Sequence, residues 1–417
     1  VALQLWIHLV GYSPFAMRSF SAIGVGFGAA ATVLLARRFG GARLVPVVAV
    51  VYLTVPMVTW AASEARSYAW VIALNAWAAV ALLRAMRRGG RAWVLYVVVA
   101  ALSVGVFIYS SLVVITHMIA VAAYPQGSRR GRLVGVVSAL LALAVASPVV
   151  VLAFGQRSQV SWIGPLTPDM LRSAALQWFG DSPLYSVPAW LMIAVGIGAV
   201  LIRRSVVPDD GRRLVLSLVL PWLLLPTALL LLATAAGQPL YVSRYAAISV
   251  PALALLLGIG ITAFGRRGLA GAVLLAVLTV PTFVVQRLPL ANGTDWQRSA
   301  STVAEWATPG EAFYFAQTGA VLNPRSMLAA YPSDFAGLRD IAMQWNAASL
   351  GGLFDTVLPA DQALVAAGRP DRVIVIADNA APWWNSLEMQ AFSAEGYKAI
   401  ESSVGATTTV FLVEKQP

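Results

Sequence analysis

The chain has 417 residues, of which 59% are hydrophobic and 11% are charged, and its formal net charge is +11. Long apolar runs recur through the first two thirds, which excludes an ordinary soluble domain and predicts a polytopic helical membrane protein. The absence of cysteine excludes disulfides, thiolate metal sites and thiolate nucleophiles.

The first element is a short apolar helix, Val1 to Val10. It is too short to cross a bilayer, and Trp6 and His8 are residue types found at headgroup depth, so we expect an interfacial helix that ends at Gly11. The sequence has no initiator methionine. The charge pattern described below places residue 1 outside, so a cytoplasmic start would require an odd number of further spans before it.

About ten membrane spans are predicted after this helix. The apolar run from Ala92 to Tyr124 is about twice the length of one crossing, and Tyr109-Ser110-Ser111 is its natural break. The predicted spans are 19–36, 44–62, 67–83, 92–107, 111–128, 133–154, 187–202, 214–236, 246–265 and 268–286.

The arginines predict how these spans are oriented. Residues 1–286 contain 21 arginines, of which 16 fall on one side of the predicted spans. By the positive-inside rule the richer side is cytoplasmic. The five arginines on the other side are Arg18, Arg66, Arg157, Arg172 and Arg244. Because the basic residues lie in short loops between spans, they are an orientation signal, and nucleic acid is not an expected partner.

The clearest candidate site is the segment Ser63-Glu-Ala-Arg-Ser-Tyr68 between two predicted spans. Residues 1–286 hold five acids, and Glu64 alone is flanked on both sides by membrane-length apolar sequence. An acid there is costly, so a polar partner or an aqueous cavity is expected. Glu64 and Arg66 are two residues apart and would not face each other directly on a helix. A structural pair that braces a helix end is the alternative interpretation.

Residues 287–417 change character and predict a separate soluble α/β domain. They carry thirteen acids and eight basic residues. An amphipathic stretch from Asp295 to Trp306 ends before Pro309-Gly310, and strand-like segments follow at Glu311–Ala316, Val373–Ile376 and Thr407–Val413. The domain shows no phosphate loop, metal-ligand spacing or nucleophile elbow, which favours a cap or an interaction surface. By the charge rule it lies outside the cytoplasm.

Four blocks of the sequence resemble the bacterial GT-C glycosyltransferases of the protein-mannosyltransferase and aminoarabinose-transferase type, glycosyltransferase family 39. The blocks are Val1 to Gly40, Ser63 to Tyr68, Leu240-Tyr-Val-Ser-Arg-Tyr245 before the span that contains Pro251, and Asp295-Trp-Gln-Arg298. Their order and spacing match, and together they cover most of the chain. The expected fold is therefore a GT-C-like transmembrane helical bundle, residues 1–286, followed by the α/β domain, residues 287–417.

The resemblance implies transfer of a sugar from a polyprenyl-phosphate donor to an acceptor on the outer face of the cell membrane, with inversion at the anomeric carbon. The sugar would be of the mannose or arabinose type and the acceptor an envelope lipid, glycan or protein. In this family an acid in the first outer loop is the general base, and by the match it is expected upstream of Val1. Tyr109-Ser110-Ser111 stands where many members read Tyr-Thr-His. No cofactor or metal is expected.

The chemistry of a polyprenyl-phosphate donor indicates which residues would bind it. An anionic phosphate at the membrane surface requires guanidinium groups at the outer rim, and fixed cations there stabilise the charge that grows on the leaving phosphate. Arg66 and Arg244 are predicted at such rims, with Tyr245 beside Arg244, and Arg18 precedes the first span. The alternatives are snorkelling for Arg244 and membrane anchoring for Arg18.

Glu64 and Tyr68 are the predicted acceptor-binding or positioning residues. Glu64 is the one outer acid next to a span apart from the loop acids Asp169 and Asp181, but the family places its base elsewhere. Three aromatic residues in the 155–186 loop would form a sugar-stacking surface or an interfacial belt, of which the belt is favoured. They are Trp162, Trp178 and Tyr185. The isolated histidines, His8 and His117, are expected to pack or to lie at the interface.

Two other functions are consistent with the sequence. A secondary transporter or lipid flippase is also polytopic, but it usually shows internal repeats, broken helices and ionisable residues at the membrane midplane, which this sequence does not. A non-catalytic membrane scaffold is the second alternative, and the expected position of the general base before Val1 favours it.

Overall fold

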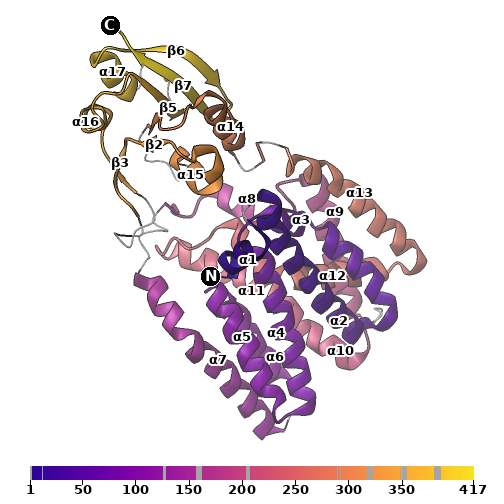
Figure 1. Ribbon diagram of the computed structural model, residues 1–417. Helices are drawn as coiled ribbons and strands as arrows, with labels where there is room; N and C mark the ends of the chain where they lie inside the picture. Colours follow the sequence, from indigo (N-terminus) through magenta and orange to yellow (C-terminus); the bar gives the residue numbers. More distant parts are fainter. Residues whose placement is uncertain are drawn as a thin grey trace. The chain divides into compact units, whose positions relative to one another are not determined.

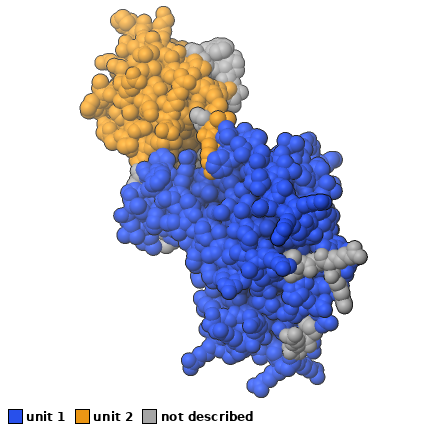
Figure 2. Space-filling model, turned by 90° about the vertical axis from the view of Figure 1, so that its right-hand side faces the viewer, with its two compact units in different colours: residues 1–286 blue, residues 287–417 orange. Residues whose placement is uncertain are grey.

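The computed structural model consists of two compact units, residues 1–286 and 287–417, which Figure 2 colours separately. The structure describes residues 2–11, 13–124, 128–155, 162–202, 207–288, 290–291, 293–316, 323–347, 349, 355–379 and 387–417. Each unit has its own buried apolar core.

The first unit is entirely helical in its described parts (Figure 1). Its α-helices are α1 (Ala2–Val10), α2 (Pro14–Thr54), α3 (Pro56–Ser63), α4 (Tyr68–Arg88), α5 (Ala92–Val106), α6 (Ser110–Ala123), α7 (Arg129–Gly155), α8 (Pro168–Leu176), α9 (Pro183–Leu201), α10 (Asp209–Leu214), α11 (Leu220–Ala235), α12 (Val250–Thr262) and α13 (Gly268–Val285). A π-helical turn, Val215–Val219, joins α10 to α11, and a 3₁₀ helix, Ser243–Ser249, leads into α12.

Seven helical segments in the described part of the chain are long and apolar enough to cross a membrane, and α5 and α6 are shorter apolar helices. The predicted spans 19–36 and 44–62 are both present within α2, which is two helical segments divided at Gly41, where the backbone is non-helical with φ 63° and ψ −157°. The Tyr52 hydroxyl donates to the Val25 carbonyl at 3.4 Å, so the two segments pack against each other. The second of these predicted spans then continues into α3 after a break before Pro56. Proline at that point cannot donate a helical N–H and favours extended backbone before it.

The predicted break in the long apolar run is present. α5 ends at Val106, Phe107 is extended with φ −153° and ψ 110°, and α6 begins at Ser110. The amide nitrogens of Ser110 and Ser111 hydrogen-bond the carbonyls of Phe107 and Ile108 in a tight turn. This turn lies at the same end of the bundle as the segment between α3 and α4, because the Phe107 ring contacts the ring of Tyr68, the first residue of α4, at 6.1 Å.

α12 is the central helix of the bundle. In the apolar 18-residue stretch within Ser243–Thr262, 94% of the residues are buried, whereas 22% are buried in the corresponding stretches of α7 and α13. α9 packs closely against α12, and a Cβ atom added at Gly260 would lie 1.8 Å from the Met192 carbonyl oxygen. Only glycine allows this backbone approach.

The second unit is an α/β/α sandwich. Its helices are α14 (Trp296–Trp306), α15 (Met327–Ala330), α16 (Ala360–Ala366) and α17 (Leu387–Ala394). Its strands are β1 (Ala312–Phe315), β2 (Arg339–Asp340), β3 (Met343–Trp345), β4 (Thr356–Val357), β5 (Arg372–Asp378), β6 (Tyr397–Val404) and β7 (Thr408–Lys415). The main sheet has the order β2-β1-β5-β7-β6, with β1 parallel to β2 and β5, and β7 antiparallel to β5 and β6.

The strand period of two places alternate side chains on opposite faces of this sheet. Phe313 and Phe315 pack with α14 and α15, whereas Tyr314 packs with α16 and α17. The helix and the three strands predicted for this unit are present as α14, β1, β5 and β7. β6 was not predicted, because its exposed, polar sequence Lys398–Ser403 lacks the alternation of a half-buried strand.

Candidate functional site

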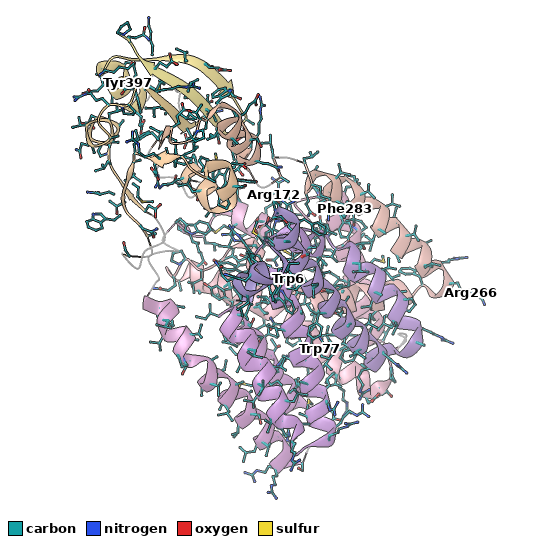
Figure 3. All side chains as sticks on the ribbon, viewed as in Figure 1. Trp6, Trp77, Arg172, Arg266, Phe283 and Tyr397 are labelled. Atoms are coloured by element: carbon teal, nitrogen blue, oxygen red, sulfur yellow. The ribbon has the colours of Figure 1, made fainter. Side chains whose placement is uncertain are left out.

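The two ends of the helical unit differ in charge. Arg172 and Phe283 lie at one end and Arg266 lies at the other (Figure 3). The Arg266 end also holds the arginines at the C-terminus of α4 and at the N-terminus of α7. The predicted site residues lie at the Arg172 end, at the C-terminus of α3, the N-terminus of α4 and the start of the 3₁₀ helix Ser243–Ser249.

Glu64 is held at the point where α3 ends. Its backbone is extended, with φ −89° and ψ 130°, and the Ser21 hydroxyl donates to the Glu64 carbonyl oxygen at 2.5 Å. The Glu64 side chain is 17% exposed, and Arg66 Nε lies 3.8 Å from Glu64 Oε2. The prediction that this pair would not face each other assumed a helix. Because residues 64–67 are not helical, the two side chains meet as an ion pair.

The positive charges of three arginines act on the Glu64 carboxyl group. Burial raises the pKa of Glu64 above its usual value, and the positive charges of Arg66, Arg18 and Arg244 oppose this shift. The arginines come from the start of α2, the loop before α4 and the 3₁₀ helix, so three segments distant in sequence meet here. The structure therefore brings the predicted residues Glu64, Arg18, Arg66 and Arg244 into one region. The roles proposed for them below are argued from the chemistry of their side chains.

Arg244 contacts an aromatic ring and no acid among the described residues. Its guanidinium carbon lies 5.3 Å from the centre of the Trp162 ring, in a cation–π contact. Its Nε is buried and has no hydrogen-bond partner, and no ion pair of Arg244 occurs among the described residues. A buried guanidinium N–H without a partner is costly, so the protein itself does not satisfy all the donors of Arg244.

Aromatic rings line the region beside these charges. Tyr245 stacks on Tyr109 with ring centres 4.9 Å apart, and Phe107 contacts both rings edge-on at 5.4 Å. Phe107 also contacts Tyr68, whose ring lies 5.0 Å from that of Trp60. The Arg66 side chain hydrogen-bonds the Tyr68 side chain. The result is a continuous aromatic wall next to a charged cluster.

The 3₁₀ helix that carries Arg244 and Tyr245 is anchored by buried tryptophans. Trp178 Nε1 donates to the Ala246 carbonyl at 2.8 Å, and Trp222 Nε1 donates to the Ile248 carbonyl at 2.7 Å. Trp178 is 1% exposed and Tyr185 is fully buried. The prediction of an interfacial belt or sugar-stacking surface is therefore wrong for both residues, which are core. Trp162, 49% exposed, is the one of the three at the surface.

The two histidines each contact another group of the helical unit. His117 is fully buried and lies 3.2 Å from the Tyr96 hydroxyl. His8 hydrogen-bonds the Gln4 carbonyl within α1. No group of three or more metal-ligand side chains occurs within the described residues. Sequence reasoning missed Ser21, Trp60 and Phe107, because their contacts with the site are long-range and their residue types are ordinary in apolar helices.

Comparison with known proteins identifies the fold. No family model matches the chain and no curated protein matches it. Two crystal structures of the aminoarabinose transferase ArnT from Cupriavidus metallidurans, one in the apo state and one bound to undecaprenyl phosphate, are 12% identical to it. Their TM-scores are 0.65 and 0.60, and each match covers 98% of this chain and 86% of ArnT.

A cryo-EM structure of the arabinofuranosyltransferase AftD from Mycobacteria is also similar, with a TM-score of 0.51 and 17% identity. The match covers 96% of this chain but 34% of AftD. These likenesses confirm the predicted fold class, a GT-C-type membrane helical bundle followed by a small α/β region. The chain is a multi-pass membrane protein with this fold.

Proposed function

We propose that the protein transfers a sugar from a polyprenyl-phosphate donor to an acceptor, with the Glu64 end of the helical unit as its active site. The observation that carries the proposal is that the positive charges of Arg66, Arg18 and Arg244 all act on one partly buried carboxyl group, Glu64. A GT-C-type fold supports a membrane glycosyltransferase, and the ArnT structure with undecaprenyl phosphate supports a polyprenyl-phosphate lipid as ligand.

Arg244 is the proposed principal ligand of the donor phosphate. Its Nε lacks a partner, whereas Arg66 is already paired with Glu64 at 3.8 Å. A guanidinium fork binds phosphate through two parallel hydrogen bonds. Arg18 and Arg66 add positive charge beside it, and the Tyr245 hydroxyl supplies a neutral donor. As the bond from phosphate to the anomeric carbon breaks, these cations stabilise the growing negative charge, which lowers the barrier.

Glu64 and Tyr68 are the proposed acceptor-binding and positioning residues. The Glu64 carboxylate holds Arg66 and accepts a hydrogen bond from an acceptor hydroxyl, and Tyr68 presents an aromatic face to the sugar. In this role Glu64 orients the nucleophile but does not remove its proton. The reaction inverts the anomeric centre, and the donor sugar is of the mannose or arabinose type, as the family resemblance implies. An envelope lipid, glycan or protein is the acceptor.

The proposed location is the cell membrane, with the Glu64 end and residues 287–417 outside the cytoplasm. The argument is the arginine bias, since the opposite end carries most of the 21 arginines of residues 1–286. Protease added to intact spheroplasts should then digest the region after Arg287. Complete protection of that region would contradict this orientation.

The direct test is turnover with a panel of polyprenyl-phosphate pentoses and hexoses, using the purified protein in nanodiscs. Release of polyprenyl phosphate should depend on one class of sugar and on Arg244. Donor binding without release for every sugar and acceptor supplied would instead support the scaffold, and vesicle translocation of the lipid without sugar transfer would support the flippase.

A further inference from the structure

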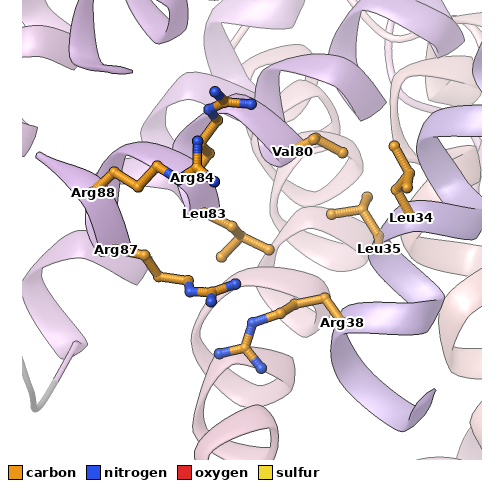
Figure 4. A pocket seen from close by; sticks show the side chains of 8 residues that line it. All are labelled: Leu34, Leu35, Arg38, Val80, Leu83, Arg84, Arg87 and Arg88. Carbon is orange, nitrogen blue, oxygen red and sulfur yellow. The ribbon is translucent and has the colours of Figure 1, made fainter. Parts of the chain in front are cut away.

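A second polar region lies at the basic end of the helical unit, where α2 and α4 enclose a cavity of about 200 Å³ (Figure 4). We call it the arginine pocket. It is lined by Leu34, Leu35, Arg38, Val80, Leu83, Arg84, Arg87 and Arg88. The α4 residues of the pocket, Val80 to Arg88, lie about 18–30 Å along this helix from Tyr68. It is therefore separate from the Glu64 site.

Helical spacing explains how the pocket combines charge with apolar surface. Arg84, Arg87 and Arg88 are separated by three and four residues, so they share one face of α4. Val80 lies one turn earlier on the same face. From α2, Leu34 contributes a side chain that is 44% exposed. The cavity thus has guanidinium groups at the end of the helix and an apolar wall towards its middle.

The positive charge of the pocket is only partly balanced. Arg38 Nη2 hydrogen-bonds Asp210 Oδ2 at 3.1 Å, but the buried Nε of Arg38 has no hydrogen-bond partner. Arg84, Arg87 and Arg88 form no ion pair within the described parts of the chain. The Arg38 and Arg87 side chains point toward one another. Like charges repel at such an approach, so a bound anion would stabilise the arrangement.

The positive-inside rule gives an ordinary reason for arginines at this end. It explains their number, but it does not require guanidinium groups from two helices to converge on one cavity with an apolar wall. A phosphate diester attached to acyl chains matches both features. Guanidinium groups bind the phosphate oxygens, and the exposed Leu34 side chain contacts the first methylenes of the chains.

We propose that the arginine pocket binds the phosphate headgroup of an anionic glycerophospholipid. The site is independent of the proposed sugar transfer and lies at the opposite end of the helical unit. Inorganic phosphate has the same anionic chemistry but no apolar tail. The lipid should therefore bind with a contribution from the apolar wall that the free anion lacks.

Native mass spectrometry of the detergent-purified protein tests this proposal. Phosphatidylglycerol, phosphatidylcholine and inorganic phosphate are titrated against the wild type and three double variants. Arg84→Gln/Arg87→Gln removes two positive charges from the pocket. Arg84→Lys/Arg87→Lys keeps both charges but removes the planar guanidinium groups that bind phosphate through two parallel hydrogen bonds. Arg266→Gln/Arg267→Gln is the matched control, because it removes the same charge from the exposed segment before α13. Thermal unfolding checks that each variant is folded.

Phosphatidylglycerol should bind the wild type more tightly than phosphatidylcholine. Its affinity should fall about tenfold in the pocket Gln variant, change little in the control, and take an intermediate value in the Lys variant. Equal losses of affinity for phosphatidylglycerol in the pocket Gln variant and the control would overturn the proposal, because the lipid would then be attracted by positive charge anywhere at this end. Equal affinity for inorganic phosphate and phosphatidylglycerol would overturn the lipid assignment. If the Gln variant does not fold, wild-type affinity in the folded Lys variant would count against recognition by the guanidinium fork.

Discussion

Replacement of Arg244 by alanine is the most specific perturbation of the proposed donor site. The Arg244 side chain has a buried Nε without a hydrogen-bond partner and contacts the Trp162 ring at 5.3 Å. If this guanidinium binds the donor phosphate, its removal deletes at least one charge-assisted hydrogen bond, worth about 1.5–3 kcal/mol. At about 1.4 kcal/mol per tenfold in Kd, the dissociation constant should rise about 10- to 150-fold.

The assay is binding of undecaprenyl phosphate to the purified protein in nanodiscs, measured for four proteins. They are the wild type, Arg244→Ala, Arg244→Lys and Arg172→Ala. Arg172 lies in α8 at the same end of the unit, so its substitution controls for the general loss of one positive charge. The lysine variant should recover only part of the affinity, because a point charge cannot reproduce the fork.

Unchanged affinity in a folded Arg244→Ala protein would refute the assignment. Arg244 would then be a snorkelling residue whose packing on Trp162 anchors the 3₁₀ helix. If Arg172→Ala loses as much affinity as Arg244→Ala, the lipid is attracted by the total positive charge at this end of the helical unit and not by Arg244 in particular.

Three further predictions test individual contacts. Glu64→Gln should weaken acceptor binding and leave kcat within about tenfold, whereas a fall in kcat of about 10²–10⁴ would identify Glu64 as the general base. Gly260→Ala should lower the thermal unfolding temperature, because its Cβ would clash with the Met192 carbonyl and overpacking costs about 1–3 kcal/mol; an unchanged temperature would disprove the close approach of α9 and α12. Asp295 is paired with Thr407, and although burial raises its pKa, hydrogen bonds from Thr407 and Ala406 lower it below the usual 3.8. Its stabilising effect should be present above about pH 4 and be lost as the pH falls through the lowered pKa. Asp295→Asn should therefore reduce stability at pH 7, by about 1 kcal/mol after solvent screening, and by progressively less as the pH falls below 3.8; a reduction of the same size at every pH would contradict this.

Local sequence signals predicted much of the helical unit. The break before Ser110 followed from the length of an apolar run, and the candidate site at Glu64 followed from one acid in apolar surroundings. The separation of spans 19–36 and 44–62 was also predicted, and the structure divides α2 between them at Gly41.

The contacts that complete the site could not be predicted from local sequence. Trp162 and Arg244 are far apart in the chain, as are Ser21 and Glu64, and only the tertiary fold brings each pair together. Trp178 was interpreted as a surface aromatic because it lies next to polar loop residues. The structure buries it against the 3₁₀ helix, where its indole N–H satisfies a backbone carbonyl.

The measurement that tests the central claim most directly is release of polyprenyl phosphate during sugar transfer. The protein in nanodiscs is incubated with each polyprenyl-phosphate sugar and an envelope extract as acceptor, and the lipid products are quantified by mass spectrometry. We predict release with at least one pentose or hexose donor in the wild type and in Arg172→Ala, and at least about tenfold less in Arg244→Ala. No release above background from any donor by the folded wild type, or equal release by Arg244→Ala, would contradict the account.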